Sequence, residues 1–198
     1  MQTAFVILAA YLVGSVPFAM ISARLFGLAD PRSYGSGNPG ATNVLRSGNK
    51  KAALFTLLGD ALKGWAAVFV AQKMGFSDNV VGLVALAVFF GHLYPVFLKF
   101  KGGKGVATGA GVLIGLDPLL GLAVIGTWLF VALTFRYSSL AAILAAAMAP
   151  VYFLLMHGAN SQIFVIGIIA MALIGKHWQN FQRLLAGQEA RIGSKKKS

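Results

Sequence analysis

The chain of 198 residues contains no cysteine and only five acidic side chains. The lack of cysteine excludes disulfides, thiolate metal sites, iron–sulfur clusters and thioester intermediates. The acidic residues, at positions 30, 60, 78, 117 and 189, are too far apart in the sequence for the carboxylate cluster of a usual two-metal site. We therefore expect neither a metal ion nor another cofactor.

Charged residues are scarce as well, at 11% of the chain against about a quarter in an ordinary globular domain. Hydrophobic residues make up 58%, which excludes a soluble protein and makes the lipid bilayer the expected partner. On a soluble protein, the net charge of +12 would suggest binding to nucleic acid. Here the basic residues lie between long apolar runs, so we interpret them as signals of membrane topology and expect no nucleic acid partner.

Seven apolar segments are candidates for transmembrane helices, which need roughly 20 residues to cross the bilayer core. The first begins at Met1 and runs without charge up to Arg24. No lysine or arginine precedes it, so we expect a retained span and not a cleaved signal peptide. The other six segments cover residues 52–73, 80–98, 105–116, 119–135, 140–156 and 161–175.

Two of these segments are short, and 105–116 would give a helix of about 18 Å against a bilayer core of about 30 Å. If all seven segments cross, every lysine and arginine lies on one side of the membrane except Lys73 and Lys63, which is within a span. If 105–135 crosses only once, Arg136 and the basic C-terminal residues move to the other side, against the positive-inside rule.

We therefore predict an all-α integral membrane protein with about seven transmembrane helices, two of them short, the N-terminus outside and the C-terminus cytoplasmic. The alternative for 105–135 is a re-entrant hairpin that turns at Asp117 and Pro118 without crossing. Because no internal repeat or long linker divides the sequence, residues 1–198 are expected to form one domain that ends in a basic tail over 193–198.

The first polar loop combines glycines with short hydrogen-bonding side chains, and Arg46 adds a fixed cation. This combination is typical of an anion-binding cradle. The glycine spacing also matches the dinucleotide-binding fingerprint, but a membrane helix precedes it where a strand is required. The alternative is an ordinary turn between two helices. The residues of the loop are Gly35, Ser36, Gly37, Asn38, Gly40, Thr42 and Asn43.

The second polar loop, residues 100–108, opens onto the short segment that begins near Gly105. Backbone N–H groups at a helix N-terminus, together with Lys104 and the glycines Gly102 and Gly103, would make a phosphate site. It is not a Walker A loop, because Gly105 follows the lysine where serine or threonine is required. The alternative is a flexible turn whose lysines only set the membrane topology.

The third candidate element follows the last span, where helical spacing places His177, Asn180 and Leu184 on one face. His177 is a candidate catalytic residue, with an interfacial histidine as the alternative. Glu189 is the only acidic residue in the C-terminal third. We expect it to have a structural role, as the ion-pair partner that docks the C-terminal segment on a basic loop.

Ionisable residues also lie inside the predicted spans. Asp60 and Lys63 are three residues apart on one face of the second span, where charges are costly unless they face the protein interior. We expect them to neutralise each other inside the bundle, with a direct catalytic role as the alternative. His92, near Pro95 in the third span, is expected to be a packed histidine beside a proline kink.

Two motifs of known enzyme chemistry are missing. None of the three histidines is followed five positions later by aspartate, the pattern of acyl-coenzyme-A acyltransferases, and no Gly-x-Ser-x-Gly nucleophile elbow occurs. A lipid enzyme with a nucleotide-activated donor would need a cluster of aspartates for metal. A small phosphate transporter is the alternative class, but the chain lacks the internal repeats that are common in transporters.

Four segments together closely resemble the bacterial acyl-phosphate:glycerol-3-phosphate acyltransferase family. They are GSGNPGATNVLR (35–46), GHLYPVFLKFKGGKGVAT (91–108), RYSSL (136–140) and HWQNFQRLLAGQE (177–189). The resemblance implies an integral enzyme of the bacterial cytoplasmic membrane whose motif loops face the cytoplasm. It would transfer a fatty acyl group from a long-chain acyl phosphate to the 1-hydroxyl of glycerol 3-phosphate. The products, lysophosphatidic acid and phosphate, would come from the first step of phospholipid synthesis.

Roles for the candidate residues follow from this resemblance. An acyl phosphate is an activated donor, so no protein nucleophile is required. We expect Arg46 and Lys104, with the backbone of 102–105, to hold the phosphates. His177 and Asn180 would orient the glycerol hydroxyl, and either His177 or a substrate phosphate, with a second pKa of about 6, would take its proton. Hydrogen bonds to the substrates would come from Ser36, Asn38, Thr42, Asn43 and Ser139.

Overall fold

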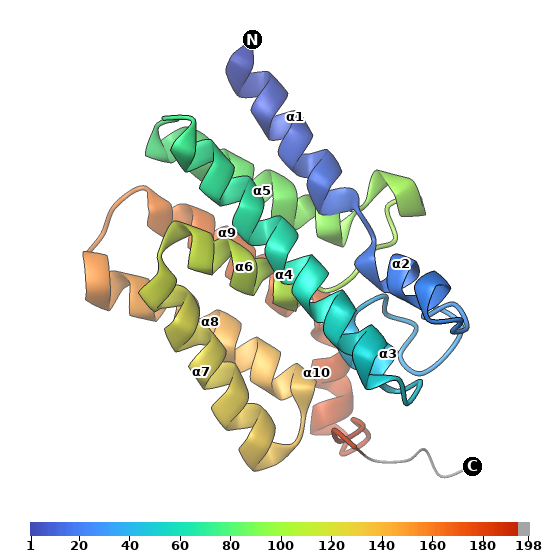
Figure 1. Ribbon diagram of the computed structural model, residues 1–198. Coiled ribbons are helices and arrows are strands. Elements are labelled where there is room, and N and C mark those ends of the chain that lie inside the picture. The colour runs from blue at the N-terminus through green and yellow to red at the C-terminus, as the bar shows by residue number, and fades with distance from the viewer. Residues whose placement is uncertain (194–198) are drawn as a thin grey trace. The chain divides into compact units, whose positions relative to one another are not determined.

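The computed structural model describes residues 1–193, and all regular elements among them are helices. This confirms the predicted all-α class. The chain forms two compact units, Met1–Gly121 and a second that begins at Leu122 (Figure 1). The single domain expected for residues 1–198 stays a prediction.

The first unit holds six α-helices and a short 3-10 helix, and α7 runs from it into the second unit. The elements in chain order are α1 (Gln2–Ser15), α2 (Phe18–Leu25), α3 (Ala41–Leu45), α4 (Lys50–Lys73), α5 (Asp78–Leu93), η1 (Val96–Leu98), α6 (Val106–Leu116), α7 (Pro118–Phe135), α8 (Ser138–His157), α9 (Gln162–Lys176) and α10 (Trp178–Leu185).

Five helical segments of the described chain are long and apolar enough to cross a membrane: Gln2–Leu25, Lys50–Lys73, Asp78–Leu98, Pro118–Phe135 and Ser138–His157. A sixth is obtained if α9 and α10, which are bent by 56° at their junction, form one span. The apolar helix α6 is shorter and corresponds to the segment 105–116 of doubtful length. The count of seven spans and the orientation of the termini stay predictions.

The first span is broken at Pro17, which the count of uncharged residues in the sequence did not take into account. α1 ends at Ser15 and α2 begins at Phe18. Pro17 has no backbone N–H and forces the residue before it into an extended conformation, which Val16 adopts with φ −63° and ψ 116°. The carbonyl oxygen of Val16 instead accepts a hydrogen bond of 2.8 Å from Nζ of Lys63 in α4.

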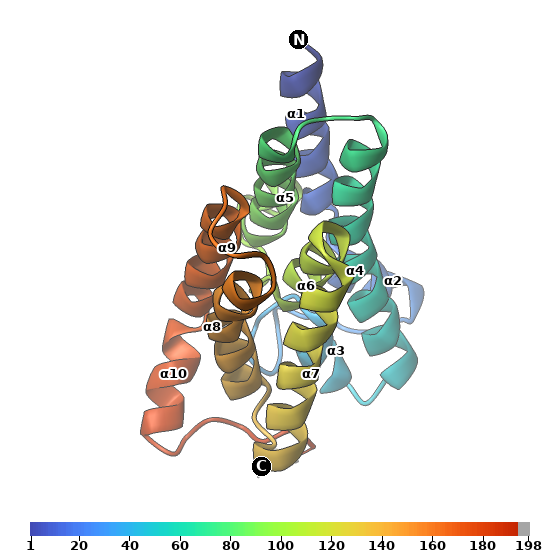
Figure 2. The same ribbon diagram turned by 90° about the vertical axis from the view of Figure 1, so that its left-hand side faces the viewer.

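Close helix packing in the first unit depends on glycine. α1 runs along α5 and α4 runs along α6 (Figure 2). A Cβ atom at Gly14 would collide with the carbonyl of Val88 in α5, and one at Gly111 would collide with the carbonyl of Ala61 in α4. Small residues allow membrane helices to approach to backbone contact in this way.

The second unit is also built on small residues. α8 packs against α9, and α10 contacts both. The hydroxyl oxygens of Thr127 in α7 and Tyr152 in α8 are 2.7 Å apart and form a hydrogen bond between these helices. The alanines buried on α8 are Ala141, Ala142, Ala145, Ala146 and Ala149.

We expect Gly111→Ala to lower the thermal unfolding midpoint of the detergent-solubilised protein. The added methyl group pushes α4 and α6 apart, and overpacking of this kind costs about 1–3 kcal/mol. Gly126→Ala in α7 is the matched control, because nothing lies within 4 Å of a Cβ at that helical position. Its midpoint should stay the same or rise, since alanine favours a helix over glycine. Equal midpoints for the two variants would contradict the packing described for α4 and α6.

Candidate active site

The side chain of Asn43 organises the first polar loop. It is 1% exposed, and its Nδ2 donates to the carbonyl oxygens of Pro31 at 2.6 Å and Tyr34 at 3.2 Å. Its Oδ1 accepts from the backbone N–H of Ser36 at 2.9 Å. A Cβ at Gly35, which has a φ of +60°, would collide with this oxygen. The amide of Asn43 therefore holds the loop together from inside.

The candidate cation and hydroxyl of this loop lie next to the same amide. Oγ of Ser36 is 3.3 Å and Nη1 of Arg46 is 3.4 Å from Oδ1 of Asn43. Ser36, Arg46 and Thr42 are exposed, whereas Asn38 and Gly40 are half-buried. The loop therefore presents a hydroxyl and a guanidinium at its surface, as an anion cradle requires.

The second polar loop is fixed to the end of α5. The backbone N–H of Gly102 donates to the carbonyl of Leu93 at 3.3 Å, and that of Gly103 donates to the carbonyl of His92 at 3.1 Å. Gly105 has a φ of +87° and is the N-cap of α6. Because Gly102 and Gly103 donate within the chain, the anion contacts expected of this loop fall to Lys104 and the first N–H groups of α6.

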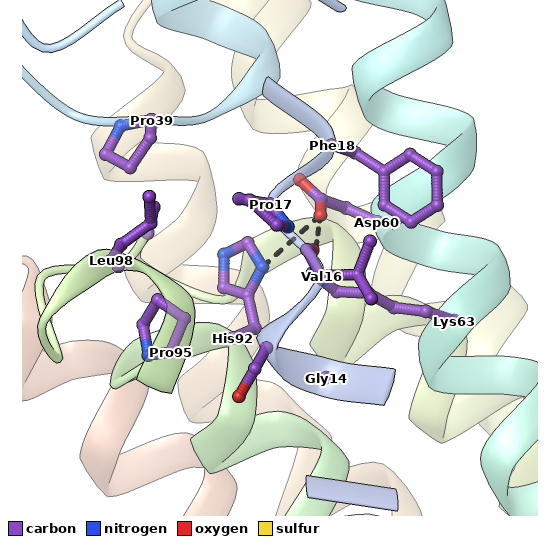
Figure 3. A pocket seen from close by; sticks show the side chains of 13 residues that line it. Gly14, Val16, Pro17, Phe18, Pro39, Asp60, Lys63, His92, Pro95 and Leu98 are labelled. Atoms are coloured by element: carbon purple, nitrogen blue, oxygen red, sulfur yellow. Dashed lines mark hydrogen bonds and ion pairs between the residues drawn. The ribbon is translucent and has the colours of Figure 1, made fainter. Parts of the chain in front are cut away.

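The two polar loops share a pocket within the first unit (Figure 3). Pro39 of the first loop lines it, as do Gly102 and Gly103 of the second. The break between α1 and α2 forms another wall. The sequence predicted two separate phosphate loops, and residues of both line this pocket, although Ser36, Arg46 and Lys104 are not among its lining residues. Their role in binding phosphate stays a prediction.

A buried charge cluster of Asp60, Lys63 and His92 also lines this pocket. Nζ of Lys63 lies 2.7 Å and Nδ1 of His92 lies 3.4 Å from Oδ1 of Asp60. The three side chains are between 3% and 8% exposed. The expected pairing of Asp60 with Lys63 is present in the structure, and His92 joins it as a third member.

Sequence reasoning missed the connection of His92 to this cluster and to the second loop. His92 is 32 positions from Asp60 along the chain, and helical periodicity relates residues only within one helix. The one available indication was that an ionisable residue inside a span needs a polar partner.

The second unit contains a separate polar cluster around Glu189. Its Oε1 accepts hydrogen bonds from Ser139 Oγ at 2.8 Å and Asn180 Nδ2 at 2.6 Å, and its Oε2 accepts from Arg183 Nε at 2.8 Å. Burial favours the neutral carboxyl, but these three hydrogen bonds and the charge of Arg183 outweigh it and hold the pKa of Glu189 below its usual value. The ion-pair partner is Arg183 of α10, and the hydrogen bond to Ser139 links the C-terminal segment to α8.

His177 lies at the junction of α9 and α10 and is 4% exposed. Its Nδ1 is 2.8 Å from the carbonyl oxygen of Leu173. Because a carbonyl only accepts hydrogen bonds, Nδ1 carries a proton, and Nε2 is the basic nitrogen of the neutral ring. The predicted neighbour Asn180 is likewise buried, at 5% exposure.

Among residues 1–193, no group of three or more histidine or acidic side chains could hold a metal ion. The side chains of the candidate residues are cations, hydroxyls, amides and one imidazole.

Comparison with known proteins identifies the family. The family model described as glycerol-3-phosphate acyltransferase matches residues 4–187. The chain belongs to the glycerol-3-phosphate acyltransferase family. This confirms the family relationship expected from the four sequence motifs.

Relatives of the same family align with nearly the whole chain. A glycerol-3-phosphate acyltransferase of Dechloromonas aromatica (strain RCB) is 80% identical over 198 residues, which is 100% of both chains. One of Cupriavidus pinatubonensis (strain JMP 134 / LMG 1197) is 59% identical over 194 residues, 96% of each chain.

Two solved structures share the fold. The crystal structure of PlsY (YgiH), an integral membrane glycerol 3-phosphate acyltransferase, in its glycerol 3-phosphate form, has a TM-score of 0.92 and 39% sequence identity. This match covers 98% of the present chain and 96% of that chain. The lysophosphatidic acid form of PlsY matches with a TM-score of 0.90 and 38% identity. The chain is thus a multi-helix integral membrane protein of this acyltransferase family.

We expect Glu189→Gln to release the C-terminal segment of this acyltransferase. The variant loses the charge that pairs with Arg183, so the amides of Gln188 and Ile192, which donate to carbonyls of Arg183 and Arg136, should lose protection from hydrogen exchange at neutral pH. Asp30→Asn removes an acid from an exposed ion pair with Arg32 and is the matched control. Unchanged protection in the Glu189 variant would contradict this role.

Acidification should likewise release the C-terminal segment of the wild-type protein, seen as lost protection of the Gln188 and Ile192 amides from hydrogen exchange. Because folding lowers the pKa of Glu189, its stabilisation is complete above the usual glutamate value of about 4.3 and is lost as the pH falls through the lower folded-state pKa.

Proposed function

We propose that this chain transfers a fatty acyl group from acyl phosphate to the 1-hydroxyl of glycerol 3-phosphate, which gives lysophosphatidic acid and phosphate. The observation that carries the proposal is the match over 98% of the chain to PlsY in two forms, one with glycerol 3-phosphate and one with lysophosphatidic acid. These two molecules are an acyl acceptor and its acylated product.

Acyl phosphate as the donor is supported by what the chain contains and what it lacks. Cysteine, the nucleophile elbow and the histidine–aspartate pattern of acyl-coenzyme-A acyltransferases are all missing from the sequence. An acyl phosphate carries its own good leaving group, so the enzyme has to align the acceptor hydroxyl and balance negative charge. Two polar loops that carry Arg46 and Lys104 supply cations for the second need.

Roles within the first unit follow from the geometry of the two loops. Lys104 directly precedes the N-cap of α6, so its ammonium and the positive end of that helix act together on a phosphate. Arg46 and Ser36 present a guanidinium and a hydroxyl at the surface of the first loop. We assign these three residues to the phosphate groups of the substrates.

We propose that His177 and Asn180 of the second unit orient the acceptor hydroxyl. The hydrogen bond from Nδ1 to Leu173 orients the His177 ring, so Nε2 is the atom that would take the hydroxyl proton. A substrate phosphate, with a second pKa of about 6, is the alternative base. Asn180 is oriented by its hydrogen bond to Glu189.

The proposed location is the bacterial cytoplasmic membrane, with seven spans, the N-terminus outside and the motif loops facing the cytoplasm. The basic residues support this orientation, because all of them outside the spans except Lys73 then face the cytoplasm. In this arrangement the short helices α6 and α9 join the five long apolar segments as spans, and α10 lies on the cytoplasmic side.

The test uses purified protein in detergent with glycerol 3-phosphate and palmitoyl phosphate, without added metal. Phosphate release and lysophosphatidic acid are followed by mass spectrometry, with palmitoyl-coenzyme A as the competing donor. We expect product from the acyl phosphate alone, and Lys104→Ala should reduce its formation by about 100-fold, the typical cost of one lost charge-stabilising group. Product from the coenzyme A donor alone would refute the proposed donor. No product from either donor, in folded protein, would refute the proposed reaction.

A further inference from the structure

The ring of His92 lies between the buried carboxylate of Asp60 and the backbone of the second polar loop. Its Nδ1 is 3.4 Å from Oδ1 of Asp60 (Figure 3). The opposite side of the ring faces Gly103, because a Cβ there would collide with Nε2 and would lie 2.9 Å from Cε1. The carbonyl of His92 also accepts the hydrogen bond from the N–H of Gly103. One residue thus holds the loop through both its backbone and its ring.

This contact explains why glycine stands at position 103. The residue has no positive φ that would require glycine, so its backbone conformation is open to alanine. The ring of His92 occupies the space that a side chain would need. Gly102 shows the same restriction, because a Cβ there would collide with the carbonyl of His92 and with Pro95. Close packing against the end of α5 therefore requires glycine at both positions.

The position of His92 is in turn set by the buried ion pair. Asp60 has Lys63 as a second partner at 2.7 Å, and Lys63 is itself held by the carbonyl of Val16 at the break between α1 and α2. Asp60 is therefore held in place, and the Nδ1 side of the ring faces it, on the side of the ring opposite the loop. A contact chain leads from the α1–α2 break through Lys63, Asp60 and His92 to Gly103, the residue before Lys104.

We propose that His92 is a positioning residue of the acyltransferase reaction, held by Asp60, whose ring sets the path of the Gly102–Gly103 backbone and thereby the placement of Lys104 and the start of α6. The inference rests on the proposed function, because it assigns that loop to a substrate phosphate. His92 acts through the loop and makes no contact with the reacting atoms. Its loss should weaken binding of the phosphate held by the loop.

The test is a double-mutant cycle of His92→Asn and Gly103→Ala in lipid nanodiscs. Asparagine keeps a donor near the position of Nδ1 for Asp60 but removes Nε2 and Cε1, the ring atoms that a Cβ at 103 would approach most closely. We expect each single variant to raise the KM for glycerol 3-phosphate or for acyl phosphate by about tenfold or more, with a much smaller change in kcat.

The KM of the double variant shows whether the two substitutions act on the same contact or impair the enzyme independently. Since the asparagine makes room for the alanine methyl group, the double variant should be no worse than His92→Asn alone. Multiplicative effects of the two changes, or a wild-type KM for both substrates in either single variant, would overturn the inference. Gly126→Ala, with open space around its Cβ, controls for a glycine replacement elsewhere and should have wild-type kinetics.

Thermal unfolding and calorimetry complete the test. Thermal unfolding identifies a variant that fails to fold. Gly103→Ala leaves His92 and Asp60 intact, so it tests the contact even if the His92 variant does not fold. Calorimetric binding of glycerol 3-phosphate and, separately, of palmitoyl phosphate needs no turnover. If the wild-type protein shows no turnover, the proposed function fails, and unchanged affinity for both molecules in the single variants would then overturn the positioning role as well.

Discussion

The ion pair of Asp60 and Lys63, buried within an apolar helix, is the interaction on which the arrangement of the first unit depends. Charges at such depth are tolerated only when they are paired and their remaining hydrogen-bonding groups are satisfied. His92 approaches the carboxylate from α5, and the carbonyl of Val16 accepts a hydrogen bond from the lysine. The pair therefore ties the broken first span, α4 and α5 together.

Both polar loops are stabilised from inside by buried groups, while the candidate substrate ligands Ser36 and Arg46 are exposed and Lys104 is half-buried. In the first loop the amide of Asn43 is enclosed by backbone, and Arg46 and Ser36 lie around it. In the second loop the end of α5 holds the glycine pair in front of Lys104. A site that binds crowded negative charge requires such support, since its cations must stay in place before the substrate arrives.

Much of the fold follows from the sequence, because long apolar runs and their basic flanks identify helices and loops. The start of α6 was expected near Gly105 and is observed at Val106, and both polar loops lie between helices as expected. The binding of anions by these loops stays a prediction. The sequence could not predict the hydrogen-bond and ion-pair partners of individual polar side chains, because these depend on contacts between helices. Asn43 closes its own loop through hydrogen bonds that the sequence did not predict, and its expected substrate contact stays a prediction. The contact of His92 with Asp60 joins residues from two different helices.

Removing both charges of the buried ion pair together shows whether the charge cluster supports the two polar loops. Asp60→Asn combined with Lys63→Met leaves no uncompensated charge in the bundle, so this variant should fold, as judged by thermal unfolding in lipid nanodiscs. Calorimetric titrations with glycerol 3-phosphate and with palmitoyl phosphate then compare the folded double variant with the wild-type protein. We expect the affinity for at least one of the two substrates to fall by about tenfold or more. Wild-type affinity for both would show that the loops do not depend on the buried pair.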